Sequence, residues 1–139
     1  MSIYWLPSTI NKQIEVMVLM TLTFFNKIGK AILFTNNKND IFLFNGTPIG
    51  YIHNDSVYSY FGSHIAWFFD GWILNHNGDA LFFTKDAVGG PGRPAQQATL
   101  NKSTPQTPPN RRARATPPSR SPKRNTWGNI SNDLLKIPS

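Results

Sequence analysis

Four glycines recur at a nearly constant interval along the chain, and the residues that follow each of them are alike. Gly29, Gly46, Gly62 and Gly78 lie 17, 16 and 16 residues apart. Three positions after each glycine stands an aliphatic residue and five positions after it an aromatic one: Ile32, Ile49, Ile65 and Leu81, then Phe34, Tyr51, Trp67 and Phe83. An offset of two places both side chains on one face of a strand. Residues 20–86 are therefore a four-fold internal repeat.

Each repeat has the pattern of a β-hairpin. A further apolar pair precedes each glycine by four and five positions: Phe24-Phe25, Ile41-Phe42, Val57-Tyr58 and Ile73-Leu74. Aromatic and β-branched runs of this length around a glycine are typical of strand, turn and strand. Asn and Asp are frequent between the units, and Asp70-Gly71 has the composition of a type I′ turn. The pattern predicts eight short strands in one meander.

Two arrangements of the eight strands agree with this pattern. Repeated hairpins can share a core, and a closed ring leaves no exposed strand edge. We therefore predict an all-β ring of four hairpins around a pseudo-four-fold axis. An open meander or one half of a sandwich is the alternative, because repetition alone does not show that the last unit meets the first.

The chain resembles a known family, the four-fold β-flower domain, from about Met20 through Pro94. The motifs that carry the resemblance are the following: Leu22-Thr-Phe-Phe-Asn, Gly46-Thr-Pro-Ile-Gly-Tyr-Ile, Val57-Tyr58, Gly62-Ser-His-Ile-Ala-Trp-Phe, Asp70-Gly71-Trp72, Asn77-Gly78, Phe82-Phe83-Thr84 and Gly89-Gly90-Pro91. The resemblance implies a shallow ring of hairpin petals, a proline-rich basic segment and a short closing motif around a tryptophan. Trp127 and Leu134-Leu135 look like that closing motif. No activity and no catalytic residue come with the resemblance, and lipid binding is implied only by fold analogy.

The chain divides into four segments on this basis. Residues 20–86 form the ring, residues 87–126 a tail, and residues 127–139 a short ending with a tryptophan. Residues 1–19 do not fit the repeat and are interpreted as a weakly ordered leader or the product of an upstream start codon. Their apolar run is too short to span a bilayer, so we expect no transmembrane segment and a cytoplasmic location.

The positive charge of the chain is concentrated in the tail. Residues 20–86 contain four lysines and five aspartates, whereas residues 88–126 contain eight Lys or Arg and no acidic residue. The same stretch contains eight prolines. Low hydrophobicity with net charge predicts a disordered segment or extended polyproline II structure.

Two functions agree with such a tail. The first is binding of a polyanion, either nucleic acid or anionic lipid, through clustered cations: Arg111, Arg112, Arg114, Arg120, Lys123 and Arg124. The second is a covering arm for the ring, anchored by Trp127. The sequence has no aromatic residue between positions 84 and 126, which disfavours base stacking on the tail itself.

The ring offers few residues for catalysis. His64 is the strongest candidate because the equivalent positions hold Ala31, Pro48 and Ala80. In a symmetric ring it could lie at a mouth beside Tyr60 and Asp70, but a histidine near a turn that bonds to a backbone carbonyl is the interpretation that we favour. His53 and His76 fall in predicted turns exposed to solvent. No nucleophile motif, phosphate loop or metal-ligand spacing is present, so the sequence predicts no enzyme, no cofactor and no metal site.

Aromatic residues of the ring are candidates for ligand binding. The candidate ligand-binding residues are His64, Tyr60, Trp67 and Trp72. If the residues four positions after each glycine faced away from the core, two small ones among them, Gly50 and Ala66, would leave a shallow groove. The sequence thus predicts a non-enzymatic binding or interaction module whose basic arm covers the ring or engages an anionic partner. A lipid or small ligand in an axial depression is the alternative, and a small core allows a homo-oligomer.

Overall fold

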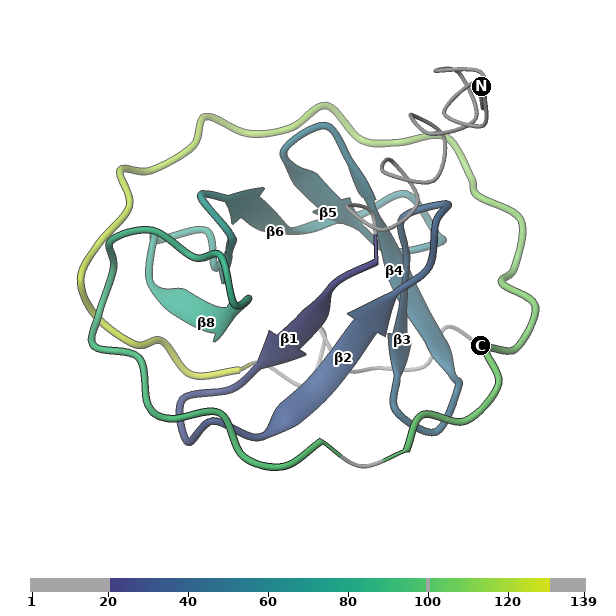
Figure 1. Ribbon diagram of the computed structural model, residues 1–139. Helices are drawn as coiled ribbons and strands as arrows, with labels where there is room; N and C mark the ends of the chain where they lie inside the picture. The colour runs from purple at the N-terminus through teal and green to yellow at the C-terminus, as the bar shows by residue number, and fades with distance from the viewer. Residues whose placement is uncertain (1–20, 100, 131–139) are drawn as a thin grey trace, which may run out of the picture.

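A computed structural model describes residues 21–99 and 101–130 and contains a closed antiparallel barrel of eight strands in sequence order (Figure 1). The strands are β1 (Thr23–Phe25), β2 (Ala31–Thr35), β3 (Asp40–Leu43), β4 (Pro48–His53), β5 (Ser56–Tyr58), β6 (His64–Phe69), β7 (Trp72–Leu74) and β8 (Ala80–Phe83). The predicted all-β ring of four hairpins is confirmed, and the open meander is excluded because β1 pairs with β8. The leader and Leu134-Leu135 lie outside the described residues.

The four repeat glycines lie in the turns that join β1 to β2, β3 to β4, β5 to β6 and β7 to β8. All four have φ between +85° and +96°, a region that suits glycine. In each hairpin a bulge shifts the strand register close to the turn. In the turns of the first and fourth hairpins, the side-chain oxygens of Asn26 and Asn75 each accept two backbone N–H bonds.

The turns between hairpins use a second type of chemistry. Asp70 and Gly71 both have positive φ, at 53° and 82°. Two successive residues with positive φ are the signature of the type I′ turn that the sequence predicted. Asn39 and Asn54 adopt positive φ at the other two junctions. Asparagine tolerates this conformation better than most residues, so the junctions need no glycine.

The core is formed by apolar side chains of all four hairpins. Its largest cluster contains aliphatic and aromatic residues from every petal: Phe24, Leu33, Ile41, Ile49, Ile52, Val57, Ala66, Ile73, Leu81 and Phe82. Leu33, Ala66 and Phe82, which stand four positions after a glycine, are fully buried within it. The prediction of a groove at these positions was therefore wrong, because the strand pleat points these side chains toward the core.

The ring is closed at its weakest pairing. β1 and β8 are joined by a single pair of residues, Phe25 and Phe83, whereas every other neighbouring pair of strands shares three. The backbone of Trp127 also forms a parallel bridge with Ala80 of β8, whose other strand partner is Leu74 of β7. Residues 21–130 thus begin and end at the same seam between the first and fourth petals.

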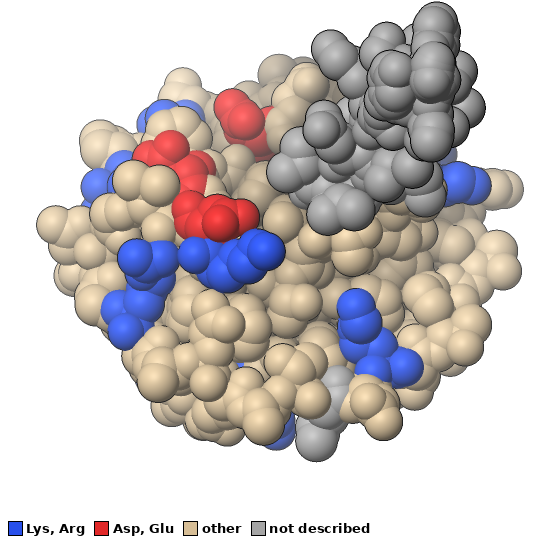
Figure 2. Space-filling view, in the orientation of Figure 1, with Lys and Arg blue, Asp and Glu red and all other residues tan. Residues whose placement is uncertain are grey.

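Residues 87–126 form no strand where they are described and run around the outside of the barrel (Figure 1). We call this segment the belt. Most of its residues are exposed. On the face seen in Figure 2, Lys and Arg side chains lie in several separate groups rather than in one patch.

Candidate functional site

The belt contacts the four glycine turns through its backbone, once per petal. The N–H groups of Gln97, Gln106, Ala115 and Arg124 donate to the carbonyls of Gly29, Gly46, Gly62 and Gly78, at 2.8 to 2.9 Å. The donors are nine residues apart, and the acceptors are 16 or 17 residues apart. Nine extended residues span about 28 Å, so the belt advances by one petal with every nine residues.

The close approach of the belt gives each repeat glycine a second role. A Cβ atom on any of the four would fall against a belt carbonyl, well inside van der Waals contact. These carbonyls belong to Ala95, Thr104, Ala113 and Pro122, again nine residues apart. The glycines are therefore needed for the turn conformation and for the space that the belt occupies.

Cations of the belt follow the same nine-residue period. They are Arg93, Lys102, Arg111 and Arg120. Three of them lie over aromatic rings of the barrel: Lys102 over Phe34 at 5.0 Å, Arg111 over Tyr51 at 3.9 Å and Arg120 over Phe69 at 3.8 Å. This period was not predicted from the sequence, although it is visible there when the tail is compared with itself at an offset of nine.

Arg111 makes the deepest side-chain contact of the belt. Its guanidinium lies 3.1 Å from Asp40 Oδ1, and Asp40 is only 5% exposed. The Tyr60 hydroxyl donates to the same carboxylate oxygen at 2.9 Å. Burial, followed by the negative charge of Asp40, raises the pKa of Tyr60 far above its ordinary value, which keeps this hydroxyl protonated as a donor. A buried carboxylate thus has both a cationic and a neutral donor.

Replacing Arg111 with glutamine is expected to lower the free energy of unfolding by about 1–3 kcal/mol, because Asp40 loses its cationic partner while remaining buried. Replacing the neighbouring Arg112 removes the same charge from an exposed side chain and should change stability by less than about 0.5 kcal/mol. Urea unfolding of both variants makes the comparison. Equal losses would contradict an inward role for Arg111.

Two further ion pairs fasten the end of the belt. Lys123 Nζ lies 2.8 Å from Asp70 Oδ2 and donates to the Val88 carbonyl. Arg124 Nε lies 3.8 Å from Asp79 Oδ1, and the Arg124 side chain remains 60% exposed. Beside this pair, the Thr126 hydroxyl donates to Asp79. Of the six predicted cations, Arg111, Lys123 and Arg124 therefore pair with acidic groups of the ring. The other three, Arg112, Arg114 and Arg120, are exposed and form no ion pair with any residue that the structure describes.

His64 lies in a cluster with a second histidine and a serine. Its Nε2 is 3.0 Å from Ser56 Oγ, and its Nδ1 is 2.9 Å from His76 Nε2. Its ring also packs on Trp67, with centroids 4.4 Å apart. Burial, followed by the charge of His76, lowers the pKa of His64. The predicted neighbours were different: Tyr60 bonds to Asp40, and Asp70 pairs with Lys123.

Trp72 is fully buried at the seam and contacts two residues that follow the ring in sequence, Val88 and Trp127. Its Nε1 donates to the Val88 carbonyl at 3.1 Å. Trp127 packs edge-on against it with centroids 5.6 Å apart, and also contacts Phe83. Of the four predicted ligand-binding residues, Trp67 packs on His64 and shares a core cluster with Trp72, whereas Tyr60 lies in a separate cluster of tyrosines.

A model of the family described as 4-fold beta flower protein matches residues 22–135. The chain belongs to the 4-fold beta flower family. The match covers the ring and the belt together, and so includes the two segments that meet at the glycine turns. No curated protein and no solved structure matches the chain.

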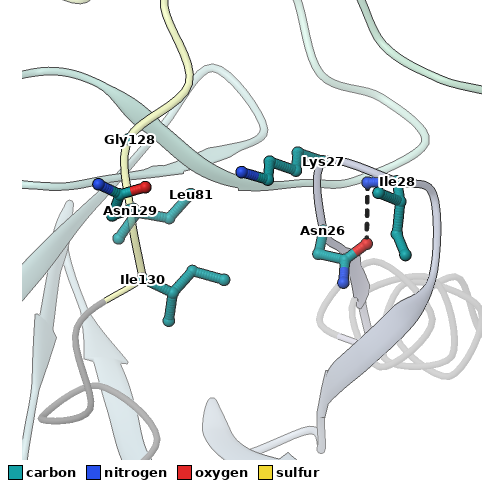
Figure 3. A pocket seen from close by; sticks show the side chains of 7 residues that line it. All are labelled: Asn26, Lys27, Ile28, Leu81, Gly128, Asn129 and Ile130. Atoms are coloured by element: carbon teal, nitrogen blue, oxygen red, sulfur yellow. Dashed lines mark hydrogen bonds between the residues drawn. The ribbon is translucent and has the colours of Figure 1, made fainter.

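The β-flower has a peripheral hollow of about 200 Å³ at the seam (Figure 3). It is lined by the first hairpin turn, β8 and the end of the described chain: Asn26, Lys27, Ile28, Leu81, Gly128, Asn129 and Ile130. Lys27 is the one charged residue of this lining, and Ile28, Leu81 and Ile130 form apolar walls. None of the predicted ligand-binding residues lines this pocket.

Within residues 21–99 and 101–130, no helix has the length and apolar character needed to cross a bilayer. The same residues contain no group of three or more His, Cys, Asp or Glu side chains placed to hold a metal ion.

Proposed function

We propose that this β-flower is a non-enzymatic interaction module that presents belt cations on a fixed ring to an anionic polymer. The observation that carries the proposal is the backbone attachment of the belt at all four glycine turns. Attachment through backbone atoms does not itself use the cationic side chains, and most of these remain exposed. A belt already ordered also avoids the entropy cost that a free basic tail meets on binding.

Two exposed cations of the belt lie at the turn of the third hairpin. Arg112 and Arg114 are exposed, and neither forms an ion pair with any residue that the structure describes. The Arg112 guanidinium lies 5.2 Å from the centre of the Phe61 ring, and Phe61 is 48% exposed. A cation beside an exposed aromatic ring suits phosphate contact with base stacking, so single-stranded nucleic acid is the polyanion that we favour.

The ring supplies the aromatic residues that the tail sequence lacks. The absence of aromatic residues between positions 84 and 126 disfavours base stacking on the tail itself. Phe61 and Phe69, however, lie beneath Arg112 and Arg120. Interleaved cations and aromatic rings therefore arise from two distant segments of the chain, which removes the main objection to this function.

The salt dependence of binding to a fluorescent single-stranded oligonucleotide tests the proposal. Each engaged cation contributes about 0.7 to the logarithmic slope, so replacing Arg112 and Arg114 together with glutamine should lower the slope by about 1.4. The matched control replaces two exposed ring lysines, Lys30 and Lys85, and removes the same charge. It should leave the slope nearly unchanged.

Three outcomes have distinct meanings. Equal slopes for both double variants would show attraction by net charge alone and would contradict a specific role for Arg112 and Arg114. No binding at low salt would overturn polyanion binding altogether and leave the belt as a cover for the ring. An apolar molecule in an organic extract of the purified protein would then favour the alternative, a small ligand, with the seam pocket as its site.

A further inference from the structure

The pair of histidines joins β6 to the turn between β7 and β8. His64 is the first residue of β6, and His76 lies in the turn between β7 and β8. The antiparallel pairing of β6 with β7 brings them together. Their facing nitrogens, Nδ1 of His64 and Nε2 of His76, are 2.9 Å apart. Neutral imidazole nitrogens are ligands for copper, nickel and zinc ions.

We propose that His64 and His76 form a two-histidine binding site for a tetragonal divalent ion, copper(II) in the first place. The site lies outside the belt and does not depend on the function proposed above. His76 is exposed, so an ion can reach the pair from solvent. Water would occupy the remaining coordination positions, since no third protein ligand is grouped with the pair among the described residues.

The surroundings of His64 fix the orientation of its ring. Its Nε2 is held by Ser56 Oγ at 3.0 Å, and Ser56 is only 4% exposed. Tyr58 packs against the ring edge-on at 5.3 Å, and Trp67 lies at 4.4 Å. Metal-binding histidines commonly have their second nitrogen held in this way, which orients the first nitrogen and sets its tautomer. Here the first nitrogen faces His76.

The distance between the two nitrogens selects the kind of ion. Ligands at a right angle, with bonds of about 2.0 Å, have their nitrogens about 2.9 Å apart, whereas tetrahedral ligands need about 3.3 Å. Without an ion the two nitrogens share one hydrogen bond at 2.9 Å, so ion binding requires the donor imidazole to carry its proton on its other ring nitrogen. The same 2.9 Å separation agrees with neighbouring positions of a square-planar or octahedral shell. Copper(II) and nickel(II) favour such shells, and copper(II) binds nitrogen ligands more tightly than nickel or zinc.

Titration of the full chain with copper(II), followed by electron paramagnetic resonance, tests the site. We expect one ion per chain, with hyperfine coupling to two nitrogens, and weaker binding of nickel(II). His76→Asn should weaken copper binding at least tenfold and remove the coupling to the second imidazole. Because His76 is exposed in a turn, this variant should keep the fold.

His53 is the matched control, because the sequence contains three histidines and His53 is the one outside the pair. It also lies next to a turn, at the end of β4. His53→Asn should bind copper as the unchanged protein does. Copper binding that survives His76→Asn would locate the ion elsewhere, for instance at the terminal amine, and would overturn the proposal. Equal weakening by both variants, or no binding at micromolar copper, would also overturn it.

Discussion

Replacing Gly62 with alanine is expected to lower the free energy of unfolding by about 2–4 kcal/mol and to detach the belt from the third petal. Gly62 has a φ of +96°, which costs an L-residue about 1–2 kcal/mol. The added Cβ would also meet the Ala113 carbonyl, so the belt must move. That movement would weaken or break two backbone hydrogen bonds, from the Ala115 N–H to the Gly62 carbonyl and from the Arg112 N–H to the Tyr60 carbonyl. Each contributes about 0.5–1.5 kcal/mol to stability.

The control for this variant lies in the belt itself. A Cβ at Gly92 would meet no atom within 4 Å, and Gly92 does not have positive φ. Gly92→Ala should therefore be neutral or slightly stabilising. Urea unfolding measures the loss, and limited trypsin digestion at Arg112 and Arg114 reports release of the belt. Unchanged stability and unchanged digestion of the Gly62 variant would mean that the belt does not rest on this turn.

Replacing Trp72 with alanine should destabilise the protein by about 3–5 kcal/mol, the largest effect that we expect from a single side chain. Trp72 is fully buried, its indole nitrogen donates to Val88, and it supports Trp127. Loss of the indole ring would open a cavity at the seam, where a single pair of residues joins β1 to β8. Thermal and urea unfolding of the two proteins provide the measurement.

A pair of milder variants separates the hydrogen bond from the packing. Trp72→Phe loses the bond to the Val88 carbonyl. Trp67→Phe removes an indole nitrogen that is buried without a hydrogen-bond partner in the described structure. Both changes remove similar volume, so the Trp72 variant should be the less stable by about 1 kcal/mol. The reverse order would show that Val88 is not a significant partner.

The ring could be predicted from the sequence because its signals are local. The glycine of each turn, the aliphatic and aromatic residues that follow it and the Asp70-Gly71 junction all act within one hairpin. Closure was harder to predict, because it depends on one pair between the first and last strands, Phe25 and Phe83. The four-fold repeat favoured closure through symmetry.

An arm on the ring, anchored by Trp127, was one of two predictions for the tail, but its path over the four glycine turns was not predicted, because composition does not reveal a partner surface. Proline and arginine together indicate an extended chain, but they do not show what the chain lies on. Position 111 illustrates the difference. In the sequence Arg111 is one of several adjacent cations, whereas in the structure it alone among them contacts the buried Asp40. Only the fold distinguishes it from Arg112.

The histidine pair was missed for a related reason. His64 was selected because it breaks the repeat, and its partner was sought at Tyr60 and Asp70. His76 is twelve residues away in a turn and looked like a solvated side chain. The register of β6 with β7, which pairs Trp67 with Leu74, places the start of β6 beside that turn. Register is set by the whole sheet and is not evident from the two histidines.

The nine-residue spacing of the belt restricts how a gene for such a protein can change length. A fifth petal would need sixteen more residues in the ring and nine more in a distant part of the reading frame. Loss of one codon from the belt would shift every later donor away from its turn, whereas most substitutions on its outward side would be tolerated. The number of petals is therefore encoded twice, in the repeats of the ring and in the repeats of the belt. A viable change in that number must alter both sets of repeats together.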